Sequence, residues 1–147
     1  MAQISHAGGA ARSEITGKAV YGASAYPMPK TGFVPLEMTL ADIEKVIYDF
    51  TRAAVRAKSA GFDLLDISGG FCGYVRPNAK EQGYFSELTE AIKRVVNIPV
   101  VLTGGITDAA AAETLLKNNQ ADLIGVGRAI LKDSLWAQRA MSDFQKM

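Results

Sequence analysis

The residues best suited to chemistry lie in two glycine turns near the C-terminus. The pair Gly104–Gly105 follows the apolar run Pro99–Leu102, and the pair Gly127–Arg128 follows a second apolar run. Glycine lets backbone N–H groups approach a ligand closely, and arginine can bind a phosphate through two parallel hydrogen bonds. Residues 98–131 are therefore predicted to form a phosphate-binding site.

Two consecutive βα units must hold these turns in place. Pro99–Leu102 has no polar alternation, which is typical of a parallel strand buried on both faces, and Asp122–Val126 repeats the pattern. Asp108 can cap a helix that begins at Ala109. In a TIM barrel, a phosphate site of this kind lies in the loops after the seventh and eighth strands.

The rest of the chain supplies similar elements. Thr39 and Asp42 nearly match a capping box, so a helix is predicted from Leu40 to the glycine at position 61. Alternating strands and helices predict an α/β fold with a parallel sheet. The further strands are expected at Ala2–Ser5 and Phe62–Ile67, and the further helices at Ser86–Val96 and Asp133–Phe144.

Residues 7–38 show no sustained periodicity, and glycines, prolines and scattered polar residues dominate them. A loop of this length is uncommon in a compact domain unless it has a function. It is therefore predicted either to cover a ligand or to have lost its packing partners.

Composition narrows the classes of partner and compartment. The 147 residues carry a net charge of +1 with no block of like charge, which argues against a nucleic acid or an anionic membrane as the partner. A small-molecule ligand is expected instead. The single cysteine, Cys72, excludes an internal disulfide, and no transmembrane run, signal peptide or metal-ligand cluster is visible. These features predict a cytoplasmic protein without a metal.

Four segments resemble the Old Yellow Enzyme family of FMN-dependent NAD(P)H oxidoreductases, also called ene-reductases. They are AQISHAGGAA, against the family pattern Q-[LI]-x-H-x-G-R, PLEMTLADIEKVIYDFTRAAVRAKSAGFD, FDLLDISGG and IPVVLTGGIT…ADLIGVGRAIL. The resemblance implies a TIM barrel, FMN as the cofactor, NAD(P)H as the reductant and an activated alkene or enone as the substrate. A protein donor would supply the proton.

The resemblance also implies roles for individual residues. Gln3 would contact the flavin pyrimidine, although a position so near the terminus favours fraying. Gly104 and Gly105 would hold the flavin phosphate with backbone amides, and Gly127 with Arg128 would complete that site. Tyr74 would be a substitute proton donor, because the family has Gly-Tyr after its histidine pair. Other side chains have simpler predicted roles: His6 as a hydrogen-bonder, Tyr84 in loop packing, and Asp66 either in the barrel centre or paired locally.

The chain departs from the family pattern at several points. Family members are full barrels of about twice this length, and this chain starts at what resembles their third strand. Its helix runs into DISGGFCGYVRP, whereas the family has a strand ending H-G-A-H-G-Y, so about two βα units are predicted to be deleted. The paired histidines are absent, because His6 is the only histidine. Gly9 stands where the first motif usually has arginine.

These observations predict a half TIM barrel, a single domain over residues 1–147 with about four parallel βα units. The predicted function is that of an FMN-dependent NAD(P)H oxidoreductase of the ene-reductase type, with little turnover because the histidine pair is missing. A non-catalytic half-barrel that binds phosphate or FMN and homodimerises is the alternative, since an open barrel exposes two strand edges. A gene fragment without function is the third possibility.

Overall fold

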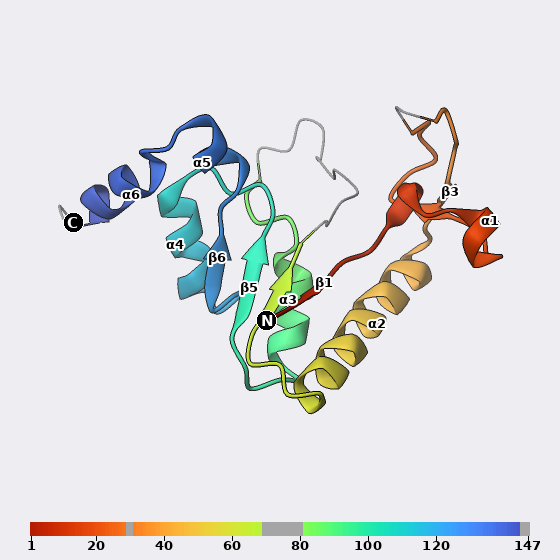
Figure 1. Ribbon diagram of the computed structural model, residues 1–147, viewed down its shortest axis with the longest axis horizontal. Helices are drawn as coiled ribbons and strands as arrows, with labels where there is room; N and C mark the ends of the chain where they lie inside the picture. The colour runs from red at the N-terminus through yellow and green to blue at the C-terminus, as the bar shows by residue number, and fades with distance from the viewer. Residues whose placement is uncertain (29–30, 69–80, 145–147) are drawn as a thin grey trace.

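A four-stranded parallel sheet forms the centre of the protein (Figure 1). The computed structural model describes residues 1–28, 31–68 and 81–144. Tyr74 and Cys72 therefore lie outside the described residues. The strands, in the spatial order β1-β4-β5-β6, are β1 (Ala2–Ile4), β4 (Leu65–Ile67), β5 (Val100–Thr103) and β6 (Leu123–Gly125). All four strands fall within the predicted ranges or one residue beyond them.

Helices follow the strands as the sequence pattern predicts. The predicted C-terminal helix begins three residues later than expected, and a short helix precedes it. In the described residues the larger helices are α2 (Leu40–Ser59), α3 (Ser86–Lys93), α4 (Ala109–Lys117), α5 (Arg128–Lys132) and α6 (Trp136–Phe144). Helix α6 and the N-terminal small elements lie at opposite ends of the molecule (Figure 1).

One face of the sheet carries the apolar core. The side chains of Leu65, Ile67 and Val100 are fully buried there, and Phe50 of α2 and Ile92 of α3 belong to the same cluster. Burying each of these large side chains stabilises the fold by about 1.5–3 kcal/mol. The core therefore lies between this face and helices α2 and α3.

The opposite face of the sheet is more open than the apolar runs predicted. Along β5, buried residues alternate with the partly buried Val101 and Thr103, and Leu123 of β6 is 48% exposed. The prediction of strands buried on both faces is therefore wrong for this chain. An apolar run in the sequence does not show whether other elements cover one face of the strand or both. Among the described residues, the core cluster forms on one face of the sheet.

Helix α2 begins at the predicted capping box. Thr39 Oγ1 accepts a hydrogen bond from Asp42 N–H at 3.2 Å, and Asp42 Oδ2 accepts one from Thr39 N–H at 2.9 Å. The Thr39 hydroxyl also donates to Asp42 Oδ2 at 2.6 Å. These bonds, the hydroxyl bond foremost, lower the pKa of Asp42 below its usual 3.8. The cap therefore stabilises the fold most above that value, and this contribution is lost as the pH falls through the lowered pKa.

The segment predicted as a long loop contains short regular elements. A 3₁₀ turn η1 (Gly8–Ala10) and helix α1 (Ser13–Thr16) precede β2 (Tyr21–Gly22), which pairs in parallel with β3 (Leu36–Glu37). The two strands form a small second sheet that precedes α2.

Gly9, the position where the family has arginine, packs closely within this segment. A β-carbon at Gly9 would lie 2.7 Å from Met28 Sδ and 3.3 Å from Pro35 Cγ. An arginine side chain could not enter this packing unless both neighbours moved. The glycine therefore fits a local arrangement in which Met28 and Pro35 occupy the available space.

Candidate functional site

The two glycine turns follow neighbouring strands, at the end of the sheet where both strands finish. Strands β5 and β6 are parallel, with Thr103 opposite Gly125, so the Gly104–Gly105 turn and the Gly127–Arg128 turn both lie at the carboxyl ends of these strands. Parallel α/β sheets commonly bind ligands at this edge. The structure thus places the predicted phosphate residues in adjacent βα loops.

Strands β5 and β6 approach closely where these turns begin. A β-carbon at Gly125 would lie only 1.9 Å from Thr103 Oγ1. The Thr103 hydroxyl donates a hydrogen bond to Asp66 Oδ1 at 2.7 Å, which fixes its orientation. Glycine at position 125 therefore allows the threonine to keep this bond.

A third segment, residues 82–85, is hydrogen-bonded to the loop that joins β5 to α4. Gly83 N–H donates to the carbonyl of Gly104 at 2.9 Å. The side-chain oxygen of Gln82 accepts hydrogen bonds from the N–H groups of Thr107 and Asp108 at 2.8 and 2.9 Å. The 82–85 segment thereby holds both ends of the loop between β5 and α4.

Two aromatic side chains of the 82–85 segment pack directly on the double glycine. A β-carbon at Gly105, whose φ is +67°, would lie 2.4 Å from Tyr84 Cε1, and one at Gly104 would lie 2.8 Å from Phe85 Cδ2. The two rings meet edge to face, with their centroids 4.9 Å apart. Both glycines are therefore required by the close approach of these rings, and Gly105 also by its positive φ.

Tyr84 also joins the two turns through its hydroxyl group. Arg128 Nη2 donates a hydrogen bond to Tyr84 Oη at 3.0 Å. The guanidinium group of Arg128, in the turn after β6, is thus held beside the Tyr84 ring. That ring packs on Gly105, in the turn after β5. This contact makes the two turns and the 82–85 segment one structural unit.

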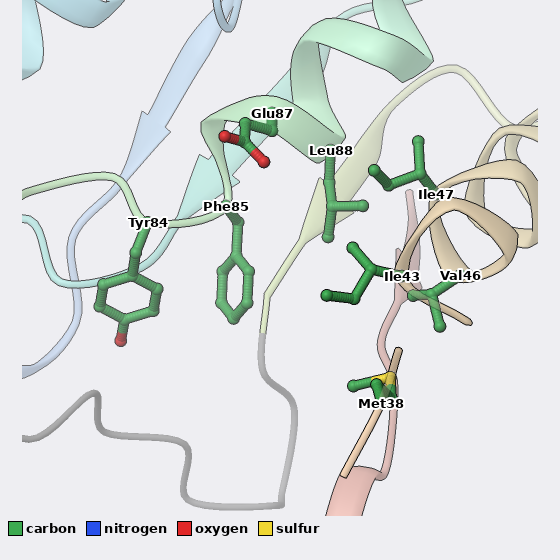
Figure 2. A pocket seen from close by; sticks show the side chains of 8 residues that line it. All are labelled: Met38, Ile43, Val46, Ile47, Tyr84, Phe85, Glu87 and Leu88. Atoms are coloured by element: carbon green, nitrogen blue, oxygen red, sulfur yellow. The ribbon is translucent and has the colours of Figure 1, made fainter. Parts of the chain in front are cut away.

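A pocket of about 180 Å³ lies on the other side of the 82–85 segment (Figure 2). Its walls come from Met38 before α2, from the start of α2, from the 82–85 segment and from α3, and they are apolar apart from Glu87 and the Tyr84 hydroxyl. No lysine or arginine among the described residues lines it, so these walls do not suit a phosphate. The lining residues are Met38, Ile43, Val46, Ile47, Tyr84, Phe85, Glu87 and Leu88.

Gln3 belongs to a polar row on the open face of the sheet. Its side-chain nitrogen donates to Asp66 Oδ2 at 2.7 Å and to Ser68 Oγ at 2.8 Å. Asp66 also accepts the hydrogen bond from Thr103, the residue before the double glycine. Gln3 is therefore an ordered part of β1, not a frayed terminus, and the polar row links it to the β5 turn.

The other residues that the sequence singles out are His6, which makes a local hydrogen bond, and Tyr74, which lies outside the described residues. His6 Nδ1 accepts a hydrogen bond from Gly8 N–H at 3.0 Å, which is the local role predicted for it. Tyr74, the predicted proton donor, lies outside the described residues. Within residues 1–28, 31–68 and 81–144, no cluster of His, Cys, Asp and Glu could hold a metal ion, and no helix is long and apolar enough to cross a membrane.

Comparison with known proteins decides the family. Residues 1–78 and 73–146 match the model of the NADH:flavin oxidoreductase / NADH oxidase family. The chain belongs to this family. The predicted relationship to Old Yellow Enzymes is confirmed, with FMN and NAD(P)H as the cofactor and reductant of the family.

Members of the NADH:flavin oxidoreductase family resemble the chain over different lengths. An NADPH dehydrogenase from Geobacillus sp. is 44% identical over 97 residues, covering 66% of this chain and 28% of that protein. An NADPH dehydrogenase from Bacillus velezensis is 27% identical over 222 residues, covering 94% of this chain and 65% of that protein. The chain thus spans less than two thirds of the length of these relatives.

The fold is shared with a solved structure of low sequence identity. Histamine dehydrogenase from Rhizobium sp. 4-9 superposes with a TM-score of 0.50 at 18% identity, over 96% of this chain and 30% of that one. The predicted partial TIM barrel with four parallel strands is confirmed.

The family match also refines the predicted deletion. The Bacillus velezensis alignment is longer than the whole chain, so that relative has internal sequence without a counterpart here. The two matched pieces meet at residues 73–78, after β4, whereas the sequence pattern placed the join between the helix and β4. Strand β4 therefore follows α2 in the order of the family.

Sequence reasoning missed the importance of Tyr84 and Gln82. The sequence predicts loop packing for Tyr84, and its ring does pack, but its hydroxyl group also binds Arg128, 44 residues away. No local pattern reports so distant a contact. The only available signal is the Gly-Tyr-Phe sequence directly before a helix.

Paired glycine substitutions test the close packing of the two turns. We expect Gly105→Ala to destabilise the fold by about 1–3 kcal/mol, because the methyl group meets the Tyr84 ring at a positive φ. Gly127→Ala is the matched control, because nothing lies within 4 Å of its β-carbon and its φ is −110°. Urea unfolding measures both. Equal stability of the two variants would contradict this packing.

Proposed function

We propose that the chain binds FMN through its phosphate group, between the Gly104–Gly105 turn and the Gly127–Arg128 turn. The observation that carries the proposal is the Arg128 guanidinium held beside the double glycine at the edge where β5 and β6 end. Membership of a flavin-dependent family supports it. In TIM barrels, the last two βα loops commonly bind phosphate, which supports the same location.

The charge and space around Arg128 suit a phosphate group. Arg128 forms no ion pair with a carboxylate among the described residues, so its positive charge is not neutralised there. A β-carbon at Gly127 would meet nothing within 4 Å, so the backbone beside the guanidinium is accessible. Backbone amides and an unneutralised guanidinium are the groups that proteins use to bind phosphate.

The same site supports the family reaction in outline. Bound FMN supplies hydride transfer between NAD(P)H and an activated alkene or enone. The polar row of Gln3, Asp66 and Thr103 would offer hydrogen bonds to the flavin pyrimidine, as predicted for Gln3. Arg128 would hold the phosphate group, so these contacts together would orient the cofactor.

We infer that turnover is slow compared with that of a complete family member. His6 is the only histidine, and it accepts a local hydrogen bond, so the histidine pair of the family pattern is absent. With the join after β4, Ser68 stands at the end of the strand where that pattern begins with histidine, and Ser68 Oγ is engaged by Gln3. Tyr74 remains the proposed proton donor.

Removal of the guanidinium tests the phosphate site. We expect purified wild-type protein to bind FMN, and Arg128→Ala to bind it about ten- to a hundredfold more weakly, because a charge-assisted contact is lost. Quenching of flavin fluorescence measures both affinities. Arg56→Ala, an exposed arginine on α2, is the matched control and should bind like the wild type. Failure of the wild type to bind FMN, or unchanged binding by Arg128→Ala, would overturn the proposal.

A second proposal, that two copies of the chain associate, has its own supporting observation. The chain exposes 9929 Å², whereas a compact monomer of 15.7 kDa exposes about 7,300 Å². The difference, about 2,600 Å² per chain, is comparable to the area that each partner of a large obligate dimer buries. Strands β1 and β6 each have one neighbour in the described sheet, so both edges of the half-barrel are available for pairing.

A charge on the open face tests association. We expect the wild type to elute in size-exclusion chromatography with light scattering at twice the 15.7 kDa chain mass. Leu123→Lys on β6 should shift it to the monomer, because pairing of the edges would enclose the open face and bury the lysine there. Val95→Lys, equally exposed but in the turn before β5, should leave the mass unchanged. A monomeric wild type would contradict this second proposal.

A further inference from the structure

We infer that Tyr84 is a positioning residue that gives the site its preference for phosphorylated flavin over riboflavin. The inference rests on the proposed FMN site and adds a residue that would act through Arg128. Its basis is one hydrogen bond, from Arg128 Nη2 to Tyr84 Oη at 3.0 Å, together with the packing that fixes the tyrosine ring.

The ring of Tyr84 is held on two sides. The backbone of Gly105 lies so close that a β-carbon there would be 2.4 Å from the ring, and Phe85 meets the ring edge to face. The segment that carries Tyr84 is itself bound to the loop after β5, through Gly83 N–H and the Gln82 side chain. The hydroxyl oxygen of Tyr84 therefore occupies a fixed position relative to the double glycine.

Arg128 depends on that fixed oxygen for its own position. Its side chain is exposed, and among the described residues its guanidinium makes this one hydrogen bond and no ion pair. A free arginine side chain samples many rotamers, and ordering it upon binding costs affinity. The bond to Tyr84 restricts the guanidinium before a ligand arrives.

A tyrosine suits this task better than a carboxylate does. The phenol oxygen accepts a hydrogen bond without carrying a negative charge, so the charge of Arg128 remains available to a phosphate. A guanidinium has five N–H donors, and one bond to Tyr84 leaves the others for a second partner. A carboxylate at the same place would hold the arginine but would also repel the phosphate. Tyr84 therefore orients Arg128 without neutralising it.

Removing only the hydroxyl group tests this role. We expect Tyr84→Phe to bind FMN about three- to tenfold more weakly, because one hydrogen bond that orients Arg128 is lost. Riboflavin has no phosphate, so its affinity should change less than about twofold. Fluorescence titrations with both flavins give the ratio of the two affinities. Tyr48→Phe on α2, an exposed tyrosine, is the matched control and should leave that ratio unchanged.

A double variant separates positioning from general stabilisation. If Tyr84 acts through Arg128, Tyr84→Phe combined with Arg128→Ala should bind FMN no more weakly than Arg128→Ala alone. Thermal unfolding of each variant reports whether the fold is intact. An additive loss in the double variant would overturn the inference.

The outcomes distinguish this inference from the proposed function. A wild type that binds FMN, with weaker binding by Arg128→Ala and an unchanged Tyr84→Phe, overturns only the role of Tyr84. Equal weakening of FMN and riboflavin by Tyr84→Phe also overturns it, because a structural role would affect both ligands. A wild type that binds riboflavin as tightly as FMN overturns the proposed phosphate site itself, and the role of Tyr84 with it.

Discussion

The packing of the Tyr84 ring on the Gly104–Gly105 turn is the contact on which the candidate site depends. It brings the segment before α3, the turn after β5 and the arginine after β6 into one unit. Larger residues at the two glycines would force the rings of Tyr84 and Phe85 away, and the guanidinium would lose its hydrogen-bond acceptor. The double glycine thus permits the close packing of both rings.

The half-barrel keeps this unit although internal sequence is missing. Strand β4 pairs directly with β1, with Gln3 opposite Asp66, so the sheet is continuous from β1 to β6. The proposed phosphate residues lie in the last two βα units, where β5 packs against β4, β6 and α3, all of which the chain retains. Loss of units before the 82–85 segment therefore leaves them in place. The open face of the sheet stays less covered than the core face, and Leu123 on it remains half exposed.

Local sequence signals predicted the elements but not the contacts between them. Thr39 and Asp42 located the start of α2, and apolar runs located β5 and β6, because caps and strands depend on neighbouring residues. The role of Tyr84 and the pairing of Gln3 with Asp66 depend on residues 44 and 63 positions away, which no local pattern reports. One-sided burial of the sheet also escaped prediction, because it depends on which elements surround a strand.

The most direct test of the phosphate site is a backbone amide NMR titration. Glycine amides resonate in a distinct region, and ¹⁵N-labelled protein titrated with FMN reports each of them separately. We expect the signals of Gly104, Gly105 and Gly127 to shift together and to saturate at one affinity. Gly17 and Gly61, which lie in turns of other segments, should stay unchanged. Shifts confined to other residues, or none at all, would contradict phosphate binding at these two turns.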